Sequence, residues 1–220
     1  MKKSSPMKYL VLLTVLVAVI LAAIVMLNNK AQNKDETLES HPDTKNQPLL
    51  GEKDAPVSVV EFGDFKCPAC KAWGESIYPQ LKEDFIDTGK ANLSYVNVLF
   101  HGEESTLGAL AAESVYKHDP DSYWEFQKEL FNQQPEEDHD APWITVEKLL
   151  EVAGNTTDMD LDQLKQDIEQ QTFKEQLELD NSLVEEFKVE KTPTVIINGV
   201  KLEDPYDYER IKSLIEEGQE

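Results

Sequence analysis

Two cysteines are the residues of this sequence with the clearest chemical potential. Cysteine occurs only at positions 67 and 70 of the 220 residues, within the stretch "EFGDFKCPAC". A disulfide stabilises a fold mainly by closing a long loop of the unfolded chain, and a bridge across two intervening residues closes almost none. We therefore expect Cys67 and Cys70 to take part in thiol–disulfide chemistry rather than to crosslink the fold.

The residues after Cys67 predict a helix that begins at this cysteine. Apolar side chains recur at intervals of three and four residues, and Pro68 suits the first turn, where a missing N–H costs nothing. Pro79 falls farther along and should kink the helix. The recurring apolar positions are Cys70, Trp73, Ile77, Leu81 and Phe85.

The predicted helix start gives the two cysteines different chemistry. Unpaired backbone N–H groups and the helix dipole favour an anion at Cys67, so its thiol should have a lowered pKa. Lys66 and Lys71 add positive charge nearby, whereas Asp64 opposes them. Cys70 lies one turn later on the apolar face and should be the buried thiol that resolves a mixed disulfide with a substrate.

Two further positions are candidates for the same site. Glu61 lies in the apolar run "VSVVEF". If its carboxyl is buried, its pKa is raised and it can take the proton of Cys70; if it points to solvent at the strand end, it has no such role. Pro193 opens the run "PTVII", and a strand tolerates proline at its start. A cis bond before this proline would turn the backbone of Thr192 toward the cysteines.

The order of the predicted elements defines the fold class. Strands over 57–62 and 91–100 flank the helix that begins at Cys67, which makes a βαβ unit with parallel strands. A second group follows much later in the chain. Asn198-Gly199 between two apolar runs predicts a β-hairpin, and a helix is expected over 206–217.

Residues 104–188, between these two groups, show only helical periodicity, and Ser105 and Asp121 are the expected N-caps of two helices. Without this block the order is βαβ–ββα, which is the thioredoxin fold. The sequence therefore predicts an α/β protein in which an all-helical insert divides a thioredoxin-like domain into residues 54–103 and 189–220.

The N-terminal residues predict a membrane anchor. Three lysines within residues 1–8 precede an uncharged apolar run over 9–27, and nineteen helical residues span about 28 Å, close to the thickness of a bilayer core. The lysines place residues 1–8 in the cytoplasm and the rest of the chain outside the cell membrane. Cleavage by signal peptidase, giving a secreted protein, is the alternative. Residues 28–53 are polar and are expected to form a flexible tether.

Charge and metal-ligand patterns narrow the function classes. The 43 acidic residues outnumber the 21 basic ones and give a formal net charge of -22, so nucleic-acid binding is excluded for want of a basic face. The histidines show no ligand spacing with one another, and we expect no metal ligands, although His101 can approach Cys67 as a copper ligand would. The acidic loop over 135–142 lacks an EF-hand pattern; a Ca²⁺ site assembled from distant acidic residues stays open.

These features together resemble the DsbA family of thiol–disulfide oxidoreductases. The resemblance rests on "EFGDFKCPAC", the helical insert and "KTPTVIING", and it covers about Asp54–Glu217. C-P-x-C is specific only in combination with the insert and the downstream Thr-Pro. The anchored layout is similar to that of the membrane-tethered, BdbD-like members from Gram-positive bacteria. Ala69 is a departure, because the best-known members have histidine there, and this leaves the strength of oxidation open.

The resemblance implies that Cys67 is the attacking cysteine and Cys70 the resolving cysteine. It implies that Pro193 is a cis proline and Glu61 a buried acid. The residues expected to contact the substrate are Thr192, Pro68 and Ala69. It also implies donation of the Cys67–Cys70 disulfide to unfolded exported proteins without another cofactor, and reoxidation by a DsbB-like, quinone-linked membrane partner. No dimerisation domain is evident, so we expect a monomer.

Two other functions stay open on this evidence. A reductase on the same fold could keep exported thiols reduced, as in cytochrome c maturation, but it needs a membrane partner that supplies electrons. A non-enzymatic module could bind copper or substrate through Cys67 and Cys70. The C-P-x-C motif and the helical insert favour the oxidase.

Overall fold

The computed structural model describes residues 13–17, 19–20, 35–137 and 141–219. The anchor expected over 9–27 falls mostly outside these residues, and the cytoplasmic end expected at 1–8 falls wholly outside them. In the described part of the chain, no helix combines the length and the apolar character that crossing a bilayer requires.

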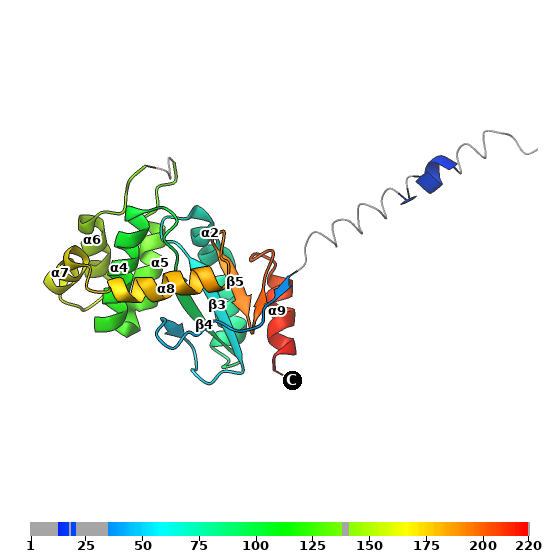
Figure 1. The fold of residues 1–220 in the computed structure, drawn as a ribbon, viewed down its shortest axis with the longest axis horizontal. Helices are drawn as coiled ribbons and strands as arrows, with labels where there is room; N and C mark the ends of the chain where they lie inside the picture. Colours follow the sequence, from blue (N-terminus) through cyan, green and yellow to red (C-terminus); the bar gives the residue numbers. More distant parts are fainter. Residues whose placement is uncertain (1–12, 18, 21–34, 138–140, 220) are drawn as a thin grey trace, which may run out of the picture.

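Among the described residues, six strands form one mixed sheet (Figure 1). They are β1 (Glu36–Thr37), β2 (Leu49–Leu50), β3 (Val57–Gly63), β4 (Ala91–Asn97), β5 (Thr194–Ile197) and β6 (Val200–Lys201), in the order β1-β6-β5-β3-β4-β2. The central strand β3 pairs in parallel with β4 and antiparallel with β5. This arrangement confirms the predicted βαβ–ββα order.

Two details of these strands bear on the predictions. The expected hairpin joins β5 to β6, with φ of 45° at Asn198 and 82° at Gly199, as the turn between two such strands requires. Strand β4 ends at Asn97, three residues before the predicted end. The N–H of Val98 still donates to Gly63 of β3 at 2.8 Å, and beyond it the N–H of Phe100 donates to the Asp64 carboxylate instead.

Residues 35–53 differ from the expected tether. Strand β1 pairs with β6, and β2 pairs with β4 at the opposite edge of the sheet. Between them, the side chain of Gln47 is buried and donates to Asp180. Each strand has only two residues, too few for a periodic pattern, so the polar composition alone suggested a tether. Its remaining part, 28–34, lies outside the described residues.

The helix after Cys67 is interrupted near Pro79, as predicted. It consists of α2 (Pro68–Ser76), the short α3 (Tyr78–Leu81) and the π-helical turn η1 (Lys82–Ile86). Pro79 lies in the first turn of α3, where its missing N–H breaks no hydrogen bond. The predicted apolar positions from Cys70 to Phe85 are all buried.

The helical insert lies beside the sheet (Figure 1). It contains α4 (Glu103–His118), the 3₁₀ turn η2 (Pro120–Ser122), α5 (Tyr123–Asn132), α6 (Val146–Thr156), α7 (Leu161–Gln170) and α8 (Lys174–Glu186). Helices α4 to α7 gather at one end, and α8 crosses back along the sheet toward β4. The N-caps are Gly102 for α4 and Ser122 for α5, one to three residues from the predicted Ser105 and Asp121.

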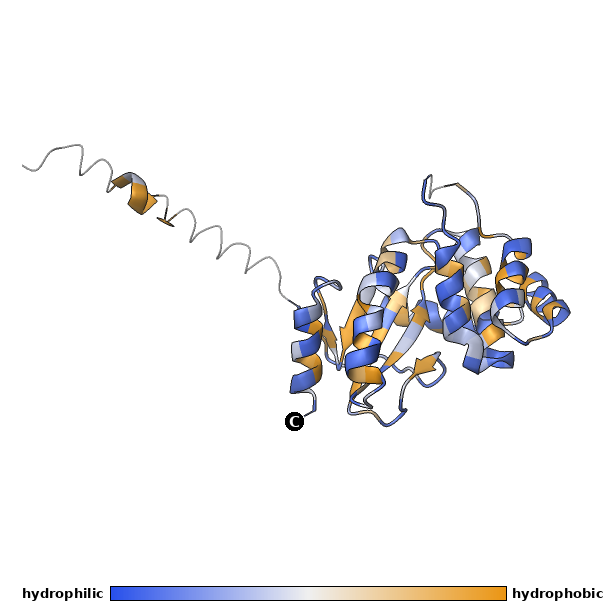
Figure 2. Cartoon of the chain, turned by 180° about the vertical axis from the view of Figure 1, so that it is seen from behind, coloured by the Kyte–Doolittle hydropathy of each residue, from blue (hydrophilic) through white to orange (hydrophobic). Residues whose placement is uncertain are grey.

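The alternating side chains of β3 enter two different cores. Val57 and Val59 pack with α2, α3 and α9 (Tyr208–Glu217), whereas Val60 and Phe62 pack on the other face with the residues after α8. Figure 2 shows apolar strands enclosed by helices whose outer faces are hydrophilic. Because side chains alternate along a strand, Glu61 shares the face of Val59 and points beneath α2.

Candidate active site

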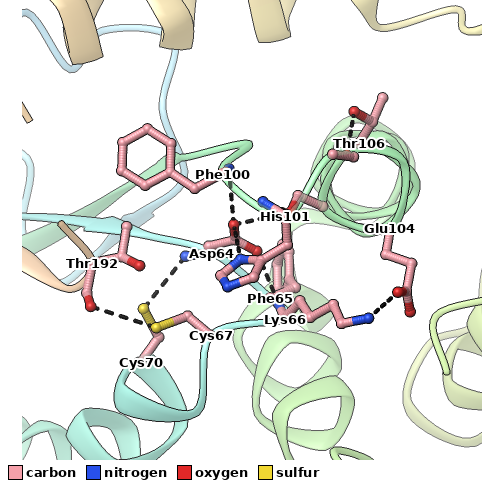
Figure 3. Close-up of polar contacts among 12 residues, drawn as sticks. Asp64, Phe65, Lys66, Cys67, Cys70, Phe100, His101, Glu104, Thr106 and Thr192 are labelled. Carbon is pink, nitrogen blue, oxygen red and sulfur yellow. Dashed lines mark hydrogen bonds and ion pairs between the residues drawn. The ribbon is translucent and has the colours of Figure 1, made fainter. Parts of the chain in front are cut away.

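Cys67 occupies the N-cap of α2, and Cys70 lies one turn inside the helix (Figure 3). Both thiols are free; Cys67 is 7% exposed and Cys70 is 0% exposed. The Cys67 Sγ lies 3.4 Å from the carbonyl oxygen of Thr192, and the backbone N–H of Asp64 donates to the Cys70 Sγ at 3.4 Å. An incoming sulfur can therefore reach Cys67 but not Cys70.

The environment separates the acidities of the two thiols. A hydrogen bond from the Cys70 thiol, assisted by Thr192 and by the backbone N–H groups of Cys70 and Ala69, lowers the pKa of Cys67 to about 5 against the opposing effect of burial. Burial raises the pKa of Cys70 well above its usual range, and the neighbouring Cys67 and Glu61 add to this effect. Cys67 is thus a thiolate at neutral pH, while Cys70 keeps its proton.

Glu61 is buried, which decides between the two alternatives left by the sequence. Its side chain is 4% exposed, and its Oε1 atom has no hydrogen-bond partner among the described residues. Burial, with the charge of Cys67 as a smaller cause, raises the pKa of Glu61 well above its usual range. Glu61 and Cys70 line the same cavity of about 220 Å³, whose far wall includes Trp124 and Gln127 of α5. The sequence did not predict this contribution of the insert.

The other predicted site residues surround Cys67. The Thr192-Pro193 peptide bond is cis, as the resemblance implied. Thr192 and Ala69 are half-buried and Pro68 is exposed, so these residues border the accessible side of the Cys67 sulfur. A bound chain at this surface can meet both the thiol and the backbone of Thr192.

Asp64 has a structural role that the sequence did not show. Its buried carboxylate accepts hydrogen bonds from the N–H of Lys66 (2.9 Å), the N–H of Phe100 (3.0 Å) and the hydroxyl of Ser105 (2.9 Å). The Nδ1 atom of His101 lies 2.8 Å from Asp64 Oδ2 (Figure 3). Asp64 therefore ties the active-site loop to the segment after β4 and to the first turn of α4. Contacts between residues so far apart in the chain produce no recognisable spacing in the sequence.

Lys66 contacts the helical insert, whereas the sequence suggested only that its charge lies near Cys67. Its ammonium group pairs with Glu104 and donates to the carbonyl of Ala141 at 3.2 Å. The Glu104 carboxylate also accepts the N–H groups of Trp143 and Ile144. The lysine thus joins the active-site loop to the insert, and Cys67 is stabilised by local hydrogen bonds instead.

Metal ligands at the cysteines have no support from the arrangement of side chains. Within the described ranges, no three His, Cys, Asp or Glu side chains gather closely enough to hold an ion. His101, which the alternative of a copper-binding module would need beside Cys67, directs Nδ1 to Asp64. Part of the acidic loop over 135–142 lies outside the described residues.

The fold and the unequal cysteine pair define the class of thioredoxin-fold thiol–disulfide oxidoreductases. Residues 43–217 match the protein-family model described as thioredoxin. Disulfide bond formation protein D of Bacillus subtilis is 44% identical over 86% of this chain and 84% of its own length. Probable disulfide bond formation protein D of Bacillus anthracis is 37% identical over 98% of each chain.

Solved structures agree with these sequence relatives. The crystal structure of oxidised BdbD from Bacillus subtilis has a TM-score of 0.80 and 42% identity, covering 84% of this chain and 98% of that chain. DsbA from Chlamydia trachomatis has a TM-score of 0.71 and 26% identity, covering 81% and 95%. This chain belongs to the family of disulfide bond formation protein D, and it is a thiol–disulfide oxidoreductase of oxidative protein folding.

Proposed function

We propose that the protein donates the Cys67–Cys70 disulfide to unfolded exported proteins. The observation that carries the proposal is the difference between a Cys67 thiol with a pKa of about 5 and a buried Cys70 thiol with a raised pKa. A stabilised thiolate favours the reduced enzyme, so the oxidised enzyme gives up its disulfide readily. This supports the oxidase over a reductase.

The reaction proceeds in two exchanges. A substrate thiolate attacks the Cys67 sulfur, the Cys67–Cys70 bond breaks, and a mixed disulfide forms between substrate and Cys67. The second substrate thiolate attacks the substrate sulfur of this bond, releasing the substrate disulfide and the Cys67 thiolate. Cys67 leaves easily because its thiolate is stabilised.

Glu61 supplies the proton that the first exchange requires. Cys70 leaves as a thiolate inside an apolar environment, where the charge is unfavourable. Burial raises the pKa of Glu61 well above its usual range, which favours its protonated form, and Glu61 lines the same cavity. It can therefore protonate Cys70 as the mixed disulfide forms, and accept this proton again when the enzyme is reoxidised.

The reduction potential of the Cys67–Cys70 pair tests the direction of exchange. Equilibration of the protein with glutathione buffers should give a potential above roughly -180 mV, toward the value of about -120 mV that DsbA shows. A value near the thioredoxin value of about -270 mV would contradict disulfide donation and favour the reductase. Ala69 would then be the first position to examine.

We also propose that the catalytic domain lies outside the cell membrane and is attached to it by an anchor at residues 9–27. We propose that the protein is a monomer and that a DsbB-like, quinone-linked partner reoxidises it. The apolar run and its flanking lysines support the anchor and the location. The proposed partner rests on the resemblance to the DsbA family. A membrane-impermeant thiol reagent should label Cys67 in intact, reduced cells. After the reductant is removed, quinone depletion should keep Cys67 reactive. Labelling only after lysis would contradict the location, and reoxidation without quinone would contradict the partner.

A second proposal is a Ca²⁺ site formed by distant residues. Asp180 accepts hydrogen bonds from Gln47 Nε2 (2.6 Å) and Asn97 Nδ2 (2.8 Å), and the latter also donates to Glu113 Oε1 (2.8 Å). Gln47 and Asn97 are 4% and 1% exposed, and their amide oxygens have no partner among the described residues. Two carboxylates beside two free amide oxygens are the ligands that calcium prefers.

The charges at this cluster favour a cation. Burial raises the pKa of Glu113 to about 8, with Asp180 as a further cause, and burial raises the pKa of Asp180 to about 6. Rotation of each amide about its last bond would turn its oxygen toward the carboxylates. A cavity of about 270 Å³ reaches Glu113 and offers a path for the ion. The ion would join the residues before β2 to β4, α4 and α8.

A further inference from the structure

Tyr206 is a polar contact of the active-site helix that comes from the other end of the chain. It lies between β6 and α9, and its hydroxyl donates a hydrogen bond to the carbonyl oxygen of Ala69 at 2.5 Å. In the opposite direction, Trp73 Nε1 of α2 donates to the carbonyl of Pro205 at 2.9 Å. These two bonds hold the loop before α9 against the first turns of α2, so Tyr206 has a fixed position.

The carbonyl that Tyr206 binds belongs to the peptide group that faces the reactive sulfur. The C=O of Ala69 and the N–H of Cys70 are the two ends of one peptide unit. This N–H donates to the carbonyl oxygen of Cys67 at 3.1 Å, and it also helps to lower the pKa of the Cys67 thiol. A hydrogen bond accepted at the oxygen polarises the peptide unit and makes its N–H a stronger donor. The Ala69 side chain is a methyl group, so polar interactions at this position run through its backbone.

We propose that Tyr206 is a positioning residue that stabilises the Cys67 thiolate through the Ala69–Cys70 peptide group. The Tyr206 hydroxyl donates to the Ala69 oxygen, and the N–H at the other end of this peptide group donates to the carbonyl of Cys67 and faces the residue that carries the thiolate. The proposal rests on the proposed function in one respect, because it assumes that a stabilised thiolate drives disulfide donation. Tyr206 itself exchanges no proton and forms no covalent bond.

The hydroxyl stays a donor throughout the working range of pH. Burial, together with the nearby acidic groups of Cys70, Cys67 and Glu61, raises the pKa of Tyr206 to about 12. The phenol therefore keeps its proton wherever Cys67 is a thiolate under physiological conditions. The effect of these three groups on Tyr206 shows that the phenol lies close to the titrating groups of the active site.

Tyr206→Phe tests the proposal, because it removes the hydroxyl and keeps the ring. We expect the pKa of Cys67, followed by the ultraviolet absorbance of the thiolate in the reduced protein, to rise by roughly 0.5 unit, since one polarising bond is lost. The equilibrium with glutathione should shift about threefold toward the protein disulfide, which corresponds to the same half unit.

Tyr208→Phe is the matched control. The Tyr208 hydroxyl donates to Asp84 Oδ2 at 2.7 Å on the surface, close to Tyr206 in the chain, and no contact joins it to the cysteines. Its loss should leave the Cys67 titration unchanged. Equal Cys67 pKa values in both variants and the wild type would overturn the proposal, even if Tyr206→Phe lowered the melting temperature.

The wild-type titration separates this proposal from the proposed function. A wild-type Cys67 that titrates in the ordinary thiol range contradicts disulfide donation and the role of Tyr206 together, before any variant is compared. A wild-type Cys67 with a low pKa that Tyr206→Phe does not change overturns the role of Tyr206 alone. A low pKa that rises in Tyr206→Phe and stays low in Tyr208→Phe supports both.

Discussion

Reduction of the Cys67–Cys70 disulfide should raise the free energy of unfolding by about 2 kcal/mol at pH 7. The fold lowers the pKa of Cys67 from 9.0 to about 5. Because pH 7 lies about two pH units above the folded pKa, the thiolate contributes about 2.7 kcal/mol at this pH. We reduce the sum to about 2 kcal/mol because part of the thiol is exposed to solvent. The oxidised protein lacks this thiolate and gains little from a bridge across two residues.

The pH dependence of this difference follows from its sign. A group whose pKa is lowered by folding stabilises the protein fully above its unfolded pKa, and the contribution is lost as pH falls through its folded pKa. The stability difference between reduced and oxidised protein should therefore be largest near pH 9 and small below about pH 5. Urea unfolding of both forms at pH 8 and pH 4.5 measures it.

Cys67→Ser is the control for this prediction, because serine has no thiolate. The reduced variant should lose the rise in stability between pH 5 and pH 9 that the reduced wild type shows. Glu113 and Asp180 also titrate within this window, but both proteins share them, so the difference between variant and wild type isolates the contribution of Cys67. An oxidised wild type that is the more stable form at every pH would falsify the interpretation of Cys67 and, with it, disulfide donation.

Calcium should raise the melting temperature of the protein by roughly 5–10 °C. An ion at about 100 times its dissociation constant stabilises the fold by about 2.7 kcal/mol, and each kcal/mol shifts the midpoint of a domain of this size by about 2–4 °C. Calorimetry in calcium and in a chelator measures the difference. Magnesium should have a smaller effect, because it prefers water and a rigid octahedron to a mixed set of carboxylates and amides.

The calcium effect should grow between pH 6 and pH 8. Folding raises the pKa values of Glu113 and Asp180, so without an ion these groups destabilise the protein progressively as pH rises from about 4 to 8. At low pH calcium must displace the protons of the two carboxyls before it can bind. At high pH it neutralises the unfavourable charge of the two buried carboxylates, so its stabilising effect is larger.

Two substitutions separate a calcium site from a general effect of salt. Glu113→Gln should abolish the calcium response. Asp167→Asn, which alters a buried carboxylate bound by Ser114 and Gln163 within the insert, should keep it. A response that survives in Glu113→Gln would show that calcium acts elsewhere.

Local patterns predicted the part of the site that one stretch of chain provides. The helix start at Cys67, its buried face and the interruption near Pro79 follow from neighbouring residues, and so does the Asn198-Gly199 hairpin. The cis bond before Pro193 followed from the family resemblance. For Glu61 the sequence left two orientations open, and the pairing of β3 with its neighbours placed the carboxyl beneath α2.

Contacts between distant segments could not be predicted in this way. Asp64 binds residues some forty positions later, and the proposed calcium ligands come from positions 47, 97, 113 and 180. Neither set of residues shows a regular spacing in the sequence, because three-dimensional packing alone brings its members together. The partner of Lys66 could not be predicted for the same reason, since Glu104 lies on the first turn of the insert.

The two short strands before β3 have a consequence for a protein that handles unfolded chains. An open sheet edge presents unpaired N–H and C=O groups to any extended polypeptide nearby. Here β1 covers the free edge of β6 and β2 covers that of β4, and each offers only two residues for further pairing. The sheet is thus shielded against adding a substrate as an extra strand, and contact with unfolded chains is left to the surface around Cys67.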